Sequence, residues 1–135
     1  MAVDRERLLQ LLERPRYHQF LGLKLEKAEE GLVQIRLPFR EDFLADEADS
    51  YVHGGVIAAL IDVAGDFALI TTHGRGLPTV DLRVDYLRPA RKEDLVATAT
   101  VVKNGRTLGI ADIRVENPDG KTVAIGRGLY STATG

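Results

Sequence analysis

The sequence contains no cysteine, and it has no excess of basic over acidic side chains. Without cysteine, a disulfide framework, a thiolate zinc site and a cysteine nucleophile are excluded. Lysine and arginine number 18 against 20 aspartates and glutamates, which gives a net charge of -2. A nucleic-acid partner is therefore not expected, because such proteins usually carry a basic stripe. The three histidines, His18, His53 and His73, show no metal spacing, so no metal is expected.

Long apolar stretches are also scarce. Residues 1–7 are charged and lead into no apolar segment, so a secretory signal is not expected. The run Val56–Ile70 is apolar, but two aspartates interrupt it and it is short for a membrane span. A chain of 135 residues, 44% hydrophobic and 28% charged, is ordinary for one globular domain. The sequence thus predicts a single cytoplasmic domain, residues 1–135, without a membrane partner.

Before this apolar run, the pattern predicts one short helix and two strands. Asp4 is a typical N-cap residue, leucines follow on one side of the helix, and Pro15 comes after its end. Strands are predicted over residues 23–29 and 32–37, the second with alternating apolar and polar side chains. The acidic segment 39–52 is interpreted as a mainly solvated connection.

After the apolar run, four further strands are predicted. Asn104-Gly105 favours a two-residue hairpin, and Asn117–Gly120 favours a second tight turn. A single long apolar helix with strands on both sides of it in the sequence needs a curved antiparallel sheet to wrap it, which predicts an α+β fold. The four strands cover residues 79–86, 95–102, 106–116 and 121–131.

The most informative segment is the turn His53-Gly54-Gly55 with the helix that follows it, predicted over residues 56–72. A bare glycine turn at a helix start presents free backbone N–H groups. The helix carries only two charges, Asp62 and Asp66. Burying a carboxylate is costly unless it is paired, hydrogen-bonded or used. Turn and carboxylates together suggest a site that polarises a carbonyl and supplies a carboxylate.

Four segments resemble one protein family. The run His53–Asp62 resembles the central helix of hotdog-fold thioesterases, in particular the phenylacetate-degradation (PaaI-like) acyl-CoA thioesterases. His18–Gly22, Val80–Ala90 and Gly105–Leu108 resemble the same group, so the similarity extends over roughly residues 16–132. The resemblance implies a hotdog fold, in which an antiparallel sheet wraps a long helix, and a homodimer, often paired into a dimer of dimers. It also implies an acyl-CoA substrate and no further cofactor.

Three residues are the candidate catalytic groups. Asp62 corresponds to the family's general base or nucleophile, although a solvent-facing carboxylate or an interface salt bridge is the commoner arrangement on spacing alone. The Gly54 N–H is expected to bind the thioester oxygen as negative charge develops, which is worth about 3 kcal/mol in the barrier. A tight turn alone would also require a small residue there. His53 is expected to orient the substrate or a water, or simply to cap the turn.

Other residues are expected to contact the substrate around this centre. Asp66 follows Asp62 by one helical turn; its position helps to place the attacking water in some relatives, but we favour a carboxylate that faces water or pairs with an arginine. A second carboxylate so close raises the pKa of one of the pair. Thr79 matches a Ser/Thr position that assists water in some relatives. Glu47 departs from the family pattern, which often has asparagine there, and Gly55 completes the turn.

Basic residues at the predicted strand ends are candidates for binding the phosphates of coenzyme A. Arg88 and Arg106 are assigned to this role, and Arg91, Lys92 and Lys103 have a similar placement. Solubility of the loop ends explains each of them equally well.

The spacing of Gly54 and Asp62 predicts how the chain assembles. Eight residues in one helix separate their backbones by ~12 Å, at ~1.5 Å per residue. An aspartate side chain spans only part of that distance, even though side chains tilt toward the helix N-terminus. One thioester carbon therefore cannot contact both groups of the same chain. We expect an obligate dimer with antiparallel central helices, in which Gly54 of one subunit acts with Asp62 of the other.

Two other functions stay open at this point. A hotdog-type hydratase or dehydratase needs an acid/base pair such as Asp49 or Glu47 with His53, but residues 49–53 lack the Asn-Pro spacing of that signature. A non-catalytic acyl-CoA-binding module is the second alternative. The acyl group, aromatic or medium-chain, is also open, as is the choice between base and nucleophile for Asp62.

Overall fold

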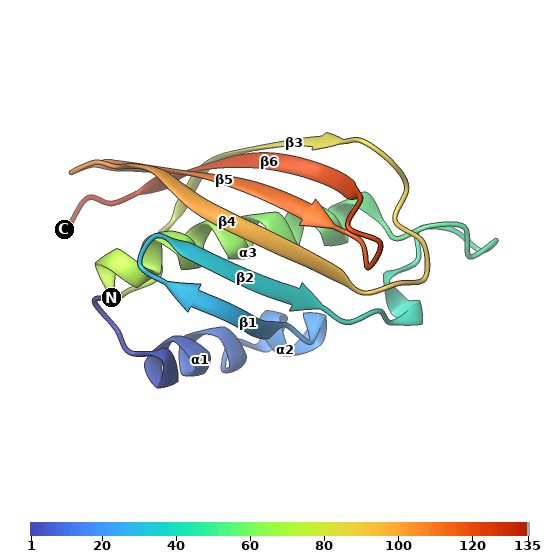
Figure 1. Cartoon of the computed structure of the whole chain (residues 1–135), viewed down its shortest axis with the longest axis horizontal. Coiled ribbons are helices and arrows are strands. Elements are labelled where there is room, and N and C mark those ends of the chain that lie inside the picture. Colours follow the sequence, from blue (N-terminus) through green and yellow to red (C-terminus); the bar gives the residue numbers. More distant parts are fainter. Residues whose placement is uncertain (135) are drawn as a thin grey trace.

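The computed structural model describes residues 1–134 and consists of one curved sheet wrapped around one long helix (Figure 1). Six antiparallel strands form the sheet in the order β1-β2-β4-β5-β6-β3, and two short helices lie on the β1 side. This is the α+β hotdog arrangement that the sequence predicts. The elements are α1 (Arg5–Glu13), α2 (Arg16–Leu21), β1 (Lys24–Glu29), β2 (Leu32–Leu37), the 3-10 turn η1 (Glu41–Phe43), α3 (Gly54–His73), β3 (Thr79–Tyr86), β4 (Leu95–Asn104), β5 (Leu108–Glu116) and β6 (Thr122–Ser131).

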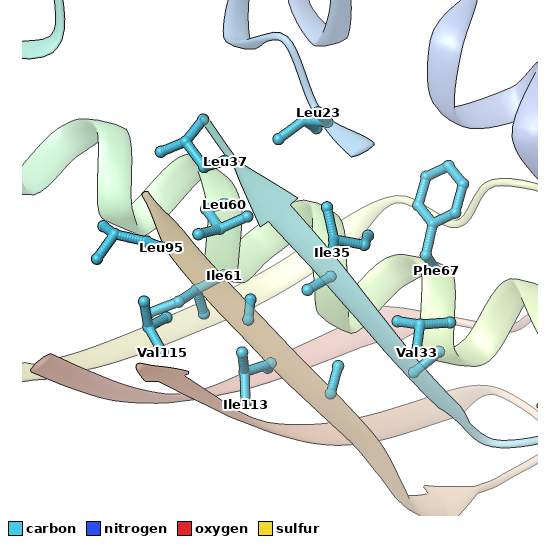
Figure 2. Packing of buried hydrophobic residues seen from close by; sticks show 14 of the residues in the cluster. Leu23, Val33, Ile35, Leu37, Leu60, Ile61, Phe67, Leu95, Ile113 and Val115 are labelled. Carbon is cyan, nitrogen blue, oxygen red and sulfur yellow. The ribbon is translucent and has the colours of Figure 1, made fainter. Parts of the chain in front are cut away.

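Alternation along the strands turns apolar side chains toward α3. In β2, Val33, Ile35 and Leu37 are buried, while the residues between them are partly exposed. Figure 2 shows these side chains in one cluster with Leu60 and Phe67 of α3. The buried and solvated faces predicted for this strand are confirmed.

Helix α3 is longer than the predicted run, since it begins two residues earlier and ends one residue later. Gly74 ends it with φ at 75°, a left-handed conformation that glycine adopts without strain. By length and composition the helix could cross a membrane, with a mean hydropathy of 1.7, but 56% of that window is buried inside the protein. A helix that is apolar on nearly all sides is typical of a protein core as well as of a membrane span.

Two surfaces of the chain are incompletely covered. Among residues 1–134, β3 is an edge strand paired only with β6, and its Val80 and Tyr86 side chains are 61% and 53% exposed. The predicted strand is confirmed, but its apolar alternation is not buried within one chain. On α3, partly exposed residues run along one face at helical spacing: Ala58, Ala59, Asp62, Val63 and Asp66.

The hairpin between β4 and β5 differs from the prediction. Asn104 pairs with Gly109, and the Gly105 N–H donates to the Leu108 carbonyl at 2.9 Å, so the loop is longer than two residues. Neither Asn104 nor Gly105 has a positive φ. Glycine is needed at position 105 for another reason, because a Cβ there would lie 2.5 Å from the Leu108 oxygen. The dipeptide marks the turn correctly but not its type.

Two short elements remain to be compared with the prediction. The sequence pattern does not predict α2, because six residues are too few to show a helical period. The turn at Asn117–Gly120 is confirmed, and the Asn117 side chain stabilises it by accepting from the backbone N–H groups of Asp119 and Lys121.

Candidate active site

The first turn of α3 presents one backbone N–H without a protein partner. His53 is the N-cap residue, and its Nδ1 accepts a hydrogen bond from the Gly55 N–H at 2.8 Å. Among residues 1–134, no hydrogen bond uses the Gly54 N–H. This donor is therefore free at the positive end of a 20-residue helix, where it can stabilise a carbonyl oxygen or an anion.

The hydrogen bond from the Gly55 N–H also determines the tautomer of a neutral His53 ring. Because Nδ1 accepts, a neutral His53 carries its proton on Nε2. The side chain is exposed, so this second N–H can donate to a bound molecule. His53 therefore caps the turn, which is one of the two roles expected from the sequence. The other role, orienting the substrate or a water, stays a prediction.

Tyr86, at the end of β3, holds the same turn from the other side. Its hydroxyl donates to the Gly54 carbonyl at 2.6 Å, and its ring would lie 3.3 Å from a Cβ at position 54. Sequence reasoning places Tyr86 in a strand but not against the helix start. Only the path of β3 along α3 brings the two together.

An apolar pocket of about 340 Å³ opens beside this turn. Arg88 is its one charged lining residue, and the Arg88 Nε donates to the Thr122 carbonyl at 3.1 Å. The lining residues are Tyr51, Val52, Gly54, Gly55, Ile57, Tyr86, Arg88, Pro89 and Ala90. Asp62, Asp66 and Thr79 are not among them, so the pocket and the carboxylates are separate within one chain.

Asp62 lies further along α3 and is held by the start of β3. The Thr79 hydroxyl donates to its Oδ1 at 2.7 Å, so these two candidate residues are in direct contact. The Tyr130 hydroxyl donates to the Asp62 backbone carbonyl at 2.9 Å. Burial, followed by the charges of Asp62 and Asp66, raises the pKa of Tyr130, so this phenol stays protonated as a donor. Asp62 is thus a partly exposed carboxylate in a fixed position.

Asp66 does not have the environment that we favoured from the sequence. Its Oδ1 accepts from the Leu77 backbone N–H at 3.0 Å, and it forms no ion pair with an arginine among residues 1–134. Burial raises the pKa of Asp66 to about 7; the Leu77 hydrogen bond opposes this shift, and the charge of Asp62 adds to it. The predicted effect of one carboxylate on the other therefore falls on Asp66.

The remaining candidates are dispersed. Glu47 is exposed in the segment between η1 and α3, outside the residues that line the pocket. Arg106 is exposed in the β4–β5 hairpin. Asn104 of that hairpin contacts His73, so Arg106 lies near the C-terminal end of α3, far from Arg88 and the pocket. One chain cannot bring Arg88 and Arg106 to the same ligand phosphate.

Comparison with known proteins establishes the family. A model of the thioesterase superfamily matches residues 49–124. The chain is 39% identical over 122 residues to a putative esterase of Halobacterium salinarum, which covers 82% of this chain and 80% of that protein. It is 30% identical over 129 residues to the medium/long-chain acyl-CoA thioesterase YigI of Escherichia coli K12, with 84% and 83% covered.

A solved structure agrees with these relatives. The PaaI protein of E. coli, from the phenylacetic acid degradation operon, superposes with a TM-score of 0.85 at 27% identity, over 96% of both chains. The chain belongs to the thioesterase superfamily. The resemblance stated from its motifs and the predicted class of thioester hydrolase are confirmed.

Proposed function

We propose that the chain is an acyl-CoA thioesterase that hydrolyses an acyl-CoA to the free acid and CoA. The observation that carries this proposal is the free Gly54 N–H at a helix N-terminus beside an apolar pocket. A thioester oxygen placed there becomes more negative in the transition state, and the donor stabilises that charge. The names of the relatives, including YigI, support the same substrate class.

The site is shared between two subunits. Within one chain, Gly54 lies in the pocket wall and Asp62 lies ~12 Å along the same helix. An antiparallel partner helix would place its Asp62 opposite Gly54 and its Gly54 opposite Asp62, which gives two sites per dimer. The exposed apolar residues of β3 and the partly exposed face of α3 are the surfaces such a partner would cover. A dimer of dimers is the expected larger assembly.

Hydrolysis can follow either of two balanced routes. As a general base, Asp62 takes a proton from water, and the hydroxide attacks the carbonyl carbon. As a nucleophile, an Asp62 oxygen attacks that carbon, and water then hydrolyses the resulting anhydride. In both routes the oxyanion lies on the Gly54 N–H, and the CoA sulfur leaves as a thiolate, which its low basicity permits. Thr79 keeps the Asp62 carboxylate oriented in both.

The acyl group is the less defined part of the substrate. An apolar pocket of about 340 Å³ accommodates a medium-chain or an aromatic acyl group. YigI is named a medium/long-chain acyl-CoA thioesterase, and the PaaI protein comes from the phenylacetic acid degradation operon. We assign Arg88 of one subunit and Arg106 of the other to the CoA phosphates, with Gly55 and Glu47 beside the substrate. A cytoplasmic location and independence from a cofactor belong to the same proposal.

The test is thiol release from octanoyl-, palmitoyl- and phenylacetyl-CoA by the wild type and Asp62→Asn. We expect turnover of at least one substrate by the wild type and its loss in the variant. Asp119→Asn, an exposed aspartate in the β5–β6 turn, is the matched control and should turn over normally. Undiminished turnover by Asp62→Asn contradicts the assignment. Loss of enoyl absorbance without thiol release indicates a hydratase, and tight binding without turnover indicates a binding module.

A further inference from the structure

The connection from α3 to β3 is held by side chains and backbone groups on both of its sides. Gly74 turns the chain away from the helix, and the Arg75 guanidinium donates to the Thr132 carbonyl at 3.2 Å. The Ser131 N–H donates to the Pro78 carbonyl at 2.9 Å. On the helix side, the Leu77 N–H is bound by Asp66. Among the hydrogen bonds of residues 1–134, this last contact is the one that joins the middle of α3 to the connection.

Thr79, the first residue of β3, depends on where this connection runs. Its side chain is exposed, and the pairing of β3 with β6 is irregular between Thr79 and Asp81. Regular sheet pairing therefore fixes its position less firmly than that of the residues after it. Its hydroxyl nevertheless lies 2.7 Å from the Asp62 Oδ1. On the helix side, the bond between Asp66 and the Leu77 N–H is a further contact that bears on this placement.

The two helix carboxylates contact the connection in parallel. Asp62 and Asp66 are one turn apart on one face of α3, and their partners, Thr79 and Leu77, are two residues apart in the chain. A backbone held at Leu77 leaves only Pro78, with its fixed φ, before Thr79. The path from the Asp66 carboxylate to the Thr79 hydroxyl is short and stiff.

We propose that Asp66 is a positioning residue for the reaction. By accepting the Leu77 N–H, it fixes the α3–β3 connection so that the Thr79 hydroxyl stays on Asp62 and orients that carboxylate toward the substrate. Asp66 itself touches neither substrate nor water in this role, which differs from direct placement of the attacking water. The inference rests on the proposed function, because it requires Asp62 to be the reacting carboxylate.

A double-mutant cycle between Asp66 and Thr79 tests the route. Asp66→Ala and Thr79→Val should each lower kcat about tenfold, the effect of one lost hydrogen bond, with KM changed less than about twofold. If Asp66 acts through Thr79, the double variant turns over no more slowly than Thr79→Val alone. Independent losses that multiply to about a hundredfold overturn the proposal, as does a Thr79→Val enzyme with wild-type kcat.

Asp66→Asn is the conservative rescue variant, because the amide oxygen can still accept from Leu77. It should keep kcat within about threefold of the wild type. A loss as large as that of Asp66→Ala overturns the proposal. If Asp66→Ala does not fold, Asp66→Ser replaces it in the cycle, since the serine hydroxyl is too short to reach Leu77.

Two further measurements separate this inference from the proposed function. Amide exchange at Leu77 should speed up in Asp66→Ala but not in Asp66→Asn, whatever the activity of either enzyme. Unchanged exchange in Asp66→Ala contradicts the tie between Asp66 and the connection. Full activity of Asp62→Asn sinks the proposed function, whereas an inactive Asp62→Asn together with an additive cycle sinks only the role of Asp66.

Discussion

The first turn of α3 and its middle offer opposite kinds of group. The turn at Gly54 offers a donor, is bare of side chains and borders an apolar pocket. The middle offers two carboxylates, and donors from the segment after the helix hold each of them. A thioester hydrolase needs both kinds at one carbon. The rise of the helix keeps them apart, which is why we propose that this chain carries complementary halves of a site rather than a whole one.

The same edge strand supports both regions, but by different residues. β3 begins at Thr79 beside Asp62 and ends at Tyr86 against Gly54. The strand therefore runs antiparallel to α3 and ties each half of the site to the sheet. Its own outer edge pairs with no other strand of the part of the chain that the structure describes. A partner that pairs there would act on both halves at once.

The largest expected effect comes from removing the carboxylate in the middle of α3. Asp62→Asn should lower kcat on the order of 10²–10⁴-fold, because an amide can neither take a proton from water nor attack the carbonyl carbon as a carboxylate does. Thiol release under saturating substrate measures this. A variant within about threefold of the wild type would remove Asp62 from the chemistry.

Removing the donor at the first turn should have the next largest effect. Gly54 is the first helical residue, where proline is tolerated, and His53 has ψ at 133°, a conformation that suits a residue before proline. Gly54→Pro thus deletes the N–H while the helix start is kept, with a small shift of the Tyr86 ring. We expect kcat to fall on the order of 10²–10³-fold. Normal turnover by this variant would show that the oxyanion lies elsewhere.

Replacing the second carboxylate, Asp66, by its amide should change the stability of the fold more than the rate of the reaction. The pKa of Asp66 is about 7 in the folded protein, above its ordinary value of 3.8 in the unfolded chain. The contribution of Asp66 to stability is therefore complete below pH 3.8 and is lost as the pH rises to the folded pKa of about 7. Asp66→Asn removes this loss. One pKa unit corresponds to about 1.4 kcal/mol. Between acid pH and about pH 8, the free energy of unfolding of the wild type should therefore fall by at most about 4 kcal/mol relative to that of Asp66→Asn.

Denaturant unfolding of both proteins at about pH 5 and about pH 8 measures the part of that gain that arises between pH 5 and the folded pKa of about 7, which is at most about 3 kcal/mol. Asp119→Asn serves as the control, because its carboxylate is exposed. Parallel pH dependence of the wild type and Asp66→Asn would contradict the buried, partly protonated state of Asp66.

The smallest effect is expected at the tyrosine that supports the first turn. Tyr86→Phe keeps the ring against Gly54 and loses one hydrogen bond to its carbonyl, which is worth about 0.5–1.5 kcal/mol. We expect kcat to fall by no more than about tenfold, with binding of the substrate nearly unchanged. A KM that rises while kcat is unchanged would instead assign Tyr86 to the pocket wall alone.

The sequence allows the fold to be predicted. It also identifies Gly54 and Asp66 as candidate site residues, but not the residues that they contact. The period-2 pattern of β2 and the glycine turn before an apolar helix are local signals, and both are correct. The contacts of Tyr86 with Gly54 and of Asp66 with Leu77 join residues that no periodicity relates. The β4–β5 hairpin shows the same limit, because a close approach to Leu108 rather than a positive φ decides where glycine is needed.

The central claim, a site made by two chains, is tested most directly by mixing two inactive variants. Asp62→Ala and Gly54→Pro subunits, unfolded and refolded together in equal amounts, should give half mixed dimers, each with one intact site of two. Activity should then recover to about a quarter of the wild-type rate, while each variant refolded alone stays inactive. Mixed dimers isolated by two different tags that remain as inactive as their parents would contradict the shared site.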